Sequence, residues 1–362
     1  MKLNVKQGDT RLTTRLICSA NHGFAPYAQE ELRRRFGAVK SRFLVPGEVF
    51  VAALEEPAEN VVEQLVSQPP IFLRHMFVVD QAWEVAGQGE SGAEREDAVH
   101  PAWISELQGL LKKDDRLQQS RIAIQTRKSE QSAWSSSAAE LKDAIQGGLD
   151  ELNAEFVVRD ADWIISVFAA VDAVYMGIAK PEHNISDWNG GAVRFQKEEG
   201  QISRAKFKLL EAEKVFGIDF SSFHQALDIG AAPGGWTSFL LERGLDVTAV
   251  DPAKLHPSVL ASPRLTYIQK NAGRVQFKDN QFDLLVCDMS WSPKLTAKLV
   301  TELLYCLVPG GTAVITVKLL TKKPMALIQE VMTTFQDARL QIQRAKQLFH
   351  NRDEITLYMV KY

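Results

Sequence analysis

Short apolar runs alternate with longer stretches of helical periodicity through the C-terminal half of the chain. Continuous apolar runs separated by helical segments are typical of strands that are buried on both faces of a parallel sheet. The runs lie at residues 226–229, 247–250, 265–268, 284–287, 313–317 and 355–360. They predict an α/β domain over residues 203–362, with a doubly wound, mostly parallel sheet and an antiparallel last strand.

The N-terminal part of the chain has a different order of elements. Gly37 follows the first helical segment and ends it, and Pro46-Gly47 divides an extended segment into two strands. The order is strand, helix, strand, strand, helix, strand, and it predicts a small α+β sandwich of ferredoxin-like type. The segments are 16–18, 28–36, 41–54, 61–66 and 72–79.

A second small α+β unit follows residues 87–97, which are rich in glycine and charge and indicate a linker. Its expected helices are 102–111 and 137–152, and its expected strands are 121–126, 163–171 and 173–178. The polar, glycine-rich residues 181–191 then lead to the last domain. We therefore expect three domains, at residues 1–86, 97–180 and 203–362.

Composition narrows the class of protein. Of the 362 residues, 45% are hydrophobic and 24% charged, as in a soluble globular protein. With a net charge of −3, any contact with nucleic acid would need basic residues clustered on one face. The N-terminus lacks the apolar core of a signal peptide, and no apolar run is long enough to span a bilayer, so we expect a cytoplasmic location.

Cys18, Cys287 and Cys306 stand singly, which predicts free buried thiols and no metal site.

A glycine-rich turn follows the first strand of the C-terminal domain and leads into a helix. Such turns let the backbone approach a nucleotide-like ligand closely, although an ordinary strand–turn–helix corner is the alternative. Asp251 ends the next strand, where a carboxylate can bind a ribose hydroxyl. The candidate cofactor residues in the turn are Asp228, Gly230, Pro233, Gly234, Gly235, Trp236 and Thr237.

Three details of this turn favour S-adenosylmethionine over NAD. Asp228 lies two residues before Gly230, where it can reach a cationic amino group. Pro233 occupies the position before the last glycines, and the second glycine of the pyrophosphate-binding GxGxxG pattern is missing. We therefore expect S-adenosylmethionine as cofactor.

Four further charged residues lie where the sheet would bring them together. Asp288 and Lys318 end two strands, Glu354 begins the antiparallel last strand, and Lys208 lies just ahead of the domain. Ligands bind beyond the carboxyl ends of the strands in such sheets. A lysine whose pKa is lowered can accept the proton of a weakly acidic hydroxyl, so we assign Lys318 as the base and Lys208 as the nearby cation. Each residue taken singly could also be an ordinary solvated or paired charge.

The segments SRAKFKLLEA, DIGAAPGGWT, CDM, VKLL and HNRDEIT resemble the FtsJ-like family of ribose 2′-O-methyltransferases. The resemblance implies a Rossmann-like methyltransferase fold, RNA as partner, and a catalytic tetrad of Lys208, Asp288, Lys318 and Glu354. The arrangement is most similar to bacterial enzymes that methylate a cytidine ribose in large-subunit ribosomal RNA. These carry an N-terminal THUMP module that binds RNA, which residues 16–180 resemble more weakly in the order of their elements.

Two features depart from the family pattern. Where the family often has an aspartate near the adenine, this chain has Gln269-Lys-Asn271. We assign Asn271 to the adenine, because an amide can bond the adenine amino group. The loop at residues 252–263 also differs. The basic segments 33–35 and 121–128, and Trp188, are candidate RNA contacts or ordinary surface and packing residues.

Two other functions stay open. One is methyl transfer to a base or a small molecule, which usually relies on a catalytic cysteine or an Asn/Asp-Pro-Pro motif. Cys287 would point to the opposite side of its strand from Asp288. The other is a catalytically silent RNA-binding assembly factor.

Overall fold

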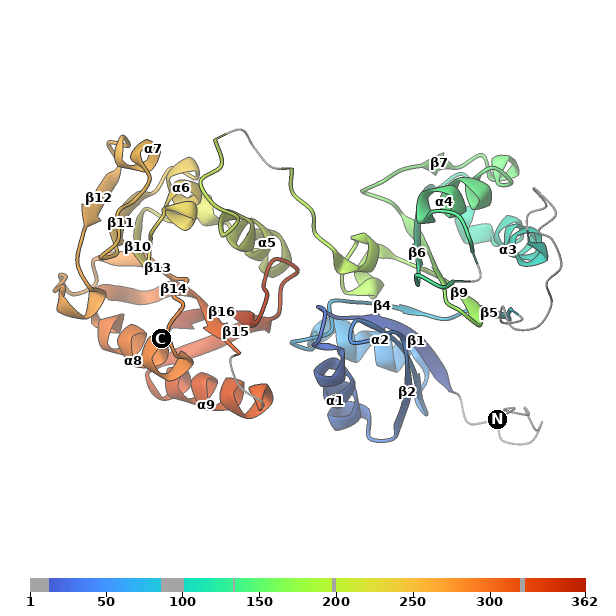
Figure 1. The fold of residues 1–362 in the computed structure, drawn as a ribbon, viewed down its shortest axis with the longest axis horizontal. Coiled ribbons are helices and arrows are strands. Elements are labelled where there is room, and N and C mark those ends of the chain that lie inside the picture. The colour runs from blue at the N-terminus through green and yellow to red at the C-terminus, as the bar shows by residue number, and fades with distance from the viewer. Residues whose placement is uncertain (1–12, 86–100, 133, 197–199, 320–322) are drawn as a thin grey trace. The chain divides into compact units, whose positions relative to one another are not determined.

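The computed structural model describes residues 13–85, 101–132, 134–196, 200–319 and 323–362 (Figure 1). Its internal contacts divide the chain into two compact units, Met1–Ala192 and Val193–Tyr362. Within the described ranges, no helix combines the length and the apolar character that a membrane crossing requires.

The first sheet of the N-terminal unit has the predicted ferredoxin-like order. Its strands are arranged β2-β3-β1-β4, with each neighbouring pair antiparallel. Gly37 ends α1 with a φ of 73°, and the break at Pro46-Gly47 separates two strands of a hairpin, as expected. The elements are β1 (Thr14–Ser19), α1 (Ala25–Phe36), β2 (Val39–Val45), β3 (Val49–Leu54), α2 (Ala58–Ser67) and β4 (His75–Val78).

The second sheet of this unit has the order β5-β9-β8-β6-β7, with β6 parallel to β7 and β8. β5 lies within the residues that we assigned to the first domain but pairs with β9, and the three-domain division stays a prediction. The elements are β5 (Gln81–Glu84), α3 (Ala102–Lys112), β6 (Arg121–Lys128), α4 (Ala138–Gln146), β7 (Glu155–Phe156), β8 (Trp163–Ala169) and β9 (Ala173–Ala179).

The helix expected over 137–152 is shorter than predicted. Ser137 caps α4 in a reciprocal pair with Glu140, and the helix ends at Gln146, before two glycines. A Cβ atom at Gly148 would lie 2.2 Å from the side-chain nitrogen of Gln108, so a larger residue there would displace the Gln108 amide. Residues 150–152 form a separate 3-10 turn.

The basic residues of β6 are largely bonded within the protein. Arg127 is mostly buried, donates to the Ser19 hydroxyl and lies 3.7 Å from Glu48. Lys128 donates to three backbone carbonyls, those of Trp134, Ser135 and Ser136. These contacts favour a structural role for both cations, and their contact with RNA stays a prediction.

The C-terminal unit contains a seven-stranded sheet of order β12-β11-β10-β13-β14-β16-β15. β16 runs antiparallel to both neighbours and the other pairs are parallel, which confirms the predicted topology. β15 was not predicted, because its sequence LQIQRAK is largely polar, as suits an edge strand. The strands are β10 (Gln225–Ile229), β11 (Asp246–Val250), β12 (Leu265–Ile268), β13 (Phe282–Cys287), β14 (Leu307–Lys318), β15 (Leu340–Lys346) and β16 (Glu354–Lys361).

Helices cover both faces of this sheet, which explains why its inner strands are largely apolar (Figure 1). α8 and α9 lie on one face, and α5, α6 and α7 on the other. Trp236 at the start of α6 donates to the carbonyl of Ala205 at 2.8 Å, and Arg243 forms two 2.7 Å bonds with Glu213, so α5 is fixed to α6. The helices are α5 (Lys206–Phe216), α6 (Gly235–Glu242), α7 (Pro257–Leu260), α8 (Pro293–Leu303) and α9 (Pro324–Asp337).

Candidate functional site

The glycine-rich turn joins the carboxyl end of β10 to the first turn of α6. Gly230 has a φ of +76°, and a Cβ atom there would lie 2.4 Å from Cγ of Met289. Gly234 has a φ of +113° and faces Val259 in the same way. Both positions require glycine, which brings the backbone of the turn close to Met289 after β13 and to Val259 of α7.

Asp251, at the end of β11, holds this turn in place. One of its carboxylate oxygens accepts from the backbone N–H of Ala232 at 3.1 Å, and the other accepts from Ala253 at 2.7 Å. The carboxylate therefore links two loops at the edge of the sheet while each oxygen keeps a lone pair for a further donor.

Asp228 is 1% exposed on β10 and accepts a 2.6 Å hydrogen bond from the hydroxyl of Thr237. Burial raises the pKa of Asp228 from its ordinary 3.8 to about 7, and the charges of Asp288 and Asp251 add to the rise. The Thr237 bond opposes this shift only in part. A buried carboxylate in this state is stabilised by an incoming cation.

A cavity of about 250 Å³ opens beside the turn. Gly230, Asp251, Asn271 and Asp288, four of the predicted residues, line it. Prediction from the sequence missed Met289, Ser290 and Trp291, which also line it. Trp291 is 41% exposed, and a tryptophan three residues after a strand-end aspartate was the signal available in the sequence.

The other predicted cofactor residues form or support the turn and do not line this cavity; they are Asp228, Pro233, Gly234, Gly235, Trp236 and Thr237. Trp236 is 3% exposed and packs in the core. The carbonyl of Pro233 accepts from His256 N–H, and Gly235 begins α6. A contact of these residues with the cofactor stays a prediction.

The structure brings Lys208, Asp288, Lys318 and Glu354 together. The ammonium group of Lys208 lies 2.9 Å from Asp288 and 2.5 Å from Glu354, and the other oxygen of Glu354 accepts from Lys318. Glu354 is thus shared by two lysines. Lys318 and Glu354 are direct partners in the antiparallel pairing of β14 with β16.

Burial and charge act against each other in this cluster. Burial lowers the pKa of Lys208, but Asp288 and Glu354 outweigh it, so the net pKa is raised. Burial raises the pKa of Glu354, but the charges and hydrogen bonds of the two lysines outweigh it and the net pKa is lowered. Lys208 therefore stays a cation and Glu354 a carboxylate near neutral pH.

Two buried residues outside the prediction hold the cluster in place. Thr316 lies two residues before Lys318, on the same face of β14, and donates to Asp288 at 2.7 Å. Glu211, 2% exposed on α5, accepts from the backbone N–H groups of Phe349 and His350 at 2.7 and 2.9 Å. Glu211 therefore fixes the loop that leads to Glu354 against the helix that carries Lys208.

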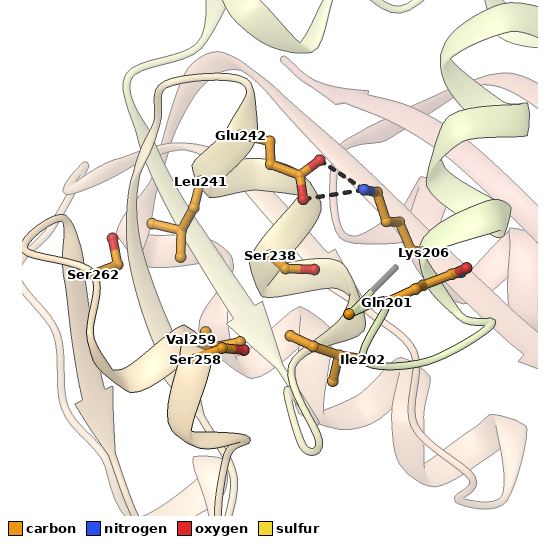
Figure 2. Close-up of a pocket in the computed structure, with 10 residues that line it drawn as sticks. Gln201, Ile202, Lys206, Ser238, Leu241, Glu242, Ser258, Val259 and Ser262 are labelled. Atoms are coloured by element: carbon orange, nitrogen blue, oxygen red, sulfur yellow. Dashed lines mark hydrogen bonds and ion pairs between the residues drawn. The ribbon is translucent and has the colours of Figure 1, made fainter. Parts of the chain in front are cut away.

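A separate hollow of about 380 Å³ lies along α5, α6 and α7 (Figure 2). Its lining includes Lys206, which points toward Glu242 and pairs with it at 2.8 Å, and the hydroxyls of Ser238, Ser258 and Ser262. The cation of Lys206 is thus neutralised by its neighbour. None of the predicted site residues lines this hollow.

Comparison with known proteins decides the class of the C-terminal unit. Residues 201–351, which carry the turn, Lys208, Asp288 and Lys318, match the family described as FtsJ-like methyltransferase. Residues 201–351 form an FtsJ-like methyltransferase domain. The cofactor of such a domain is S-adenosylmethionine, which agrees with the prediction from the turn.

Curated relatives named ribosomal RNA large subunit methyltransferase M are similar to this chain. The protein from Psychromonas ingrahamii is 34% identical over 52% of this chain and 54% of its own length. That from Halorhodospira halophila is 32% identical over 47% and 50%. The chain thus spans about half the length of these two relatives. The Citrobacter koseri protein is 27% identical over 86% of this chain and 85% of its own length.

The residues around the cavity fit the cofactor. The buried carboxylate of Asp228 suits the cationic amino group of the methionine part, and Asp251 suits the ribose hydroxyls. Asn271 lines the cavity with an amide that can bond the adenine. When bound, S-adenosylmethionine supplies an electrophilic methyl group.

We expect Gly230→Ala to abolish cofactor binding, because the new Cβ collides with Met289 in a backbone conformation that alanine resists. Isothermal titration with S-adenosylmethionine measures the loss. Gly273→Ala is the matched control, because a Cβ there meets only Leu299 at 3.7 Å. Equal affinity of Gly230→Ala and the wild type would contradict this account of the turn.

Asp228→Asn should stabilise the cofactor-free protein while weakening cofactor binding. Folding raises the pKa of Asp228 from 3.8 to about 7, so the buried carboxyl is most stable when protonated. The free energy of unfolding of the wild type therefore falls as pH rises from about 4 to about 7. Thermal unfolding should therefore show a higher midpoint for the variant than for the wild type at pH 8, with a smaller difference at pH 5. A lower midpoint for Asp228→Asn at pH 8 would overturn the assignment.

Proposed function

We propose that this FtsJ-like protein transfers a methyl group from S-adenosylmethionine to a ribose 2′-hydroxyl of RNA. The observation that carries the proposal is the sharing of the buried Glu354 by Lys208 and Lys318, beside an aspartate, Asp288, that also lines the cofactor cavity. A proton acceptor and a methyl-donor site then share one edge of the sheet.

The two lysines differ in a way that assigns their roles. Lys208 contacts both Asp288 and Glu354, which hold it as a cation. Within the described part of the chain, Glu354 is the one carboxylate at ion-pair distance from Lys318, whose side chain is also more exposed, at 21% against 13%. We therefore assign Lys318 as the base and Lys208 as the fixed cation beside it.

In the proposed reaction, neutral Lys318 accepts the proton of the 2′-hydroxyl as the oxygen forms its bond to the methyl carbon. The bond from that carbon to sulfur breaks and its electron pair stays on sulfur. Glu354 orients the Lys318 amine, and Asp288 orients Lys208. Holding the hydroxyl beside the donor supplies a proximity effect in addition to proton transfer.

The relatives support large-subunit ribosomal RNA as the source of the hydroxyl, because all three carry that substrate in their names. The burial of Cys287 argues against the rival of base methylation through a thiolate, because it raises the pKa of that thiol and keeps it protonated. We further propose that the N-terminal unit docks the RNA, with its second sheet as a THUMP-like module.

The substrate is tested by incubating the full chain with labelled S-adenosylmethionine and ribosomal RNA from a strain that lacks the gene. We expect label at a single nucleotide on mapping of ribose methylation. An oligonucleotide with that nucleotide, and its 2′-deoxy counterpart, then separates ribose from base, because only the ribose reaction needs the 2′-hydroxyl. Label on the 2′-deoxy substrate, or none on any RNA, would refute the proposal.

Lys318→Ala should lower the single-turnover rate about 10²- to 10⁴-fold, the range for loss of a general base. Affinity for S-adenosylmethionine should stay nearly unchanged, because Lys318 is not among the residues that line the cofactor cavity. Lys298→Ala, at an exposed lysine of α8, is the matched control. Full activity of Lys318→Ala would remove it as the base.

A further inference from the structure

A third cavity, of about 450 Å³, is formed by the segments that carry Lys208 and Glu354 of the lysine–carboxylate cluster. Phe207 of its lining directly precedes Lys208 on α5, and His350 lies four residues before Glu354. The remaining lining residues are Gln201, Ile202, Ser203 and Arg204. The volume falls in the range of small-ligand sites, and the cavity is separate from the one assigned to the cofactor.

Aromatic rings form one side of this cavity. Phe207 and His350 have ring centroids 5.1 Å apart, and Phe195 stacks on both, at 5.6 and 5.5 Å. Phe207 and His350 are only half-buried, so this aromatic cluster keeps accessible ring surface. Faces of this kind bind the flat, polarisable rings of nucleobases without regard to base identity.

The histidine in this cluster is a neutral, stacked ring. Burial lowers the pKa of His350, although a hydrogen bond to the Val193 backbone opposes the shift. Its Nε2 atom has no hydrogen-bond partner among the described residues. The ring therefore packs chiefly through its contacts with Phe195 and Phe207. Glu211 fixes the backbone of His350 to α5, which keeps the ring in register with Phe207.

The charge at this cavity suits a nucleic acid. Arg204 is exposed, and it is the one charged residue of the lining. A guanidinium beside aromatic rings can contact the phosphate that flanks a stacked base. A base held here would lie beside the two segments that carry Lys208 and Glu354.

We propose that this cavity seats the base of the nucleotide to be methylated, stacked against Phe207 and His350, with Arg204 on a neighbouring phosphate. The proposal rests on the function proposed above and makes Phe207 a substrate-binding residue. The base must leave its helix or come from a single strand, because only an unstacked base can enter a cavity of this kind.

The test is a double-mutant cycle between protein and RNA. The RNA oligonucleotide carries the mapped nucleotide either with its base or with an abasic ribose, and the protein is wild type or Phe207→Ala. Each single change should raise KM for RNA about tenfold, the scale of one lost stacking contact. The two changes together should do no more than either one, while affinity for S-adenosylmethionine stays constant.

Further variants separate stacking from a merely structural role. Phe207→Trp should retain a near-normal KM and Phe207→Leu should not. Phe277→Ala, at a half-buried phenylalanine packed edge-on against Phe282 near the amino edge of the sheet, should leave KM unchanged. Arg204→Ala should make the slope of log RNA affinity against log salt concentration shallower by the amount expected for about one phosphate contact.

The outcomes are distinguishable. If the wild type methylates base-bearing and abasic RNA with the same KM, the proposal is overturned, whether or not any variant folds. Additive effects of Phe207→Ala and base removal would also overturn it while leaving ribose methylation intact. If the wild type methylates no RNA, both the proposed function and this inference fail.

Discussion

The site depends on one buried carboxylate. Glu354 is 3% exposed at side-chain level and accepts from Lys208 with one oxygen and from Lys318 with the other. Removing one partner of a buried ion pair costs about 3–5 kcal/mol, so this carboxylate depends on Lys208, which stays a cation, and its other oxygen is bonded by Lys318. The same arrangement holds two ammonium groups near each other despite their repulsion, and it leaves Lys318 as the less strongly paired of the two.

The fold supplies the geometry for this interaction. Antiparallel pairing of β14 with β16 sets Lys318 directly opposite Glu354, while β13 ends at Asp288 on the neighbouring parallel strand. α5 adds Lys208 from outside the sheet, and Glu211 ties that helix to the loop before β16. Four charged groups from distant parts of the sequence thereby meet at the edge that also carries the glycine turn.

The parallel sheet and the meeting of charged residues at one of its edges could be predicted, because both depend on local patterns in the sequence. Apolar runs mark the buried strands, and charged residues at their ends fall on one edge once the sheet is parallel. β15 escaped prediction because a polar edge strand lacks that signal. The long helix expected over 137–152 was wrong because Gly147-Gly148 ends it.

Other features depend on contacts that no local pattern reports. Glu211 and Thr316 look like ordinary helix and strand residues until the fold sets them beside backbone N–H groups and Asp288. The bond from the Trp236 indole to Ala205 in the core is another such contact, and the contact of Trp236 with the cofactor stays a prediction. The raised pKa of Asp228 likewise results from burial, which sequence spacing does not reveal.

The central claim is that Glu354 organises the two lysines for proton transfer. The most direct measurement is the single-turnover rate of methyl transfer to RNA by Glu354→Gln, which keeps the shape of the side chain but removes its charge. The account predicts a loss of about 100-fold or more, with affinity for S-adenosylmethionine nearly unchanged. A rate equal to that of the wild type would contradict it.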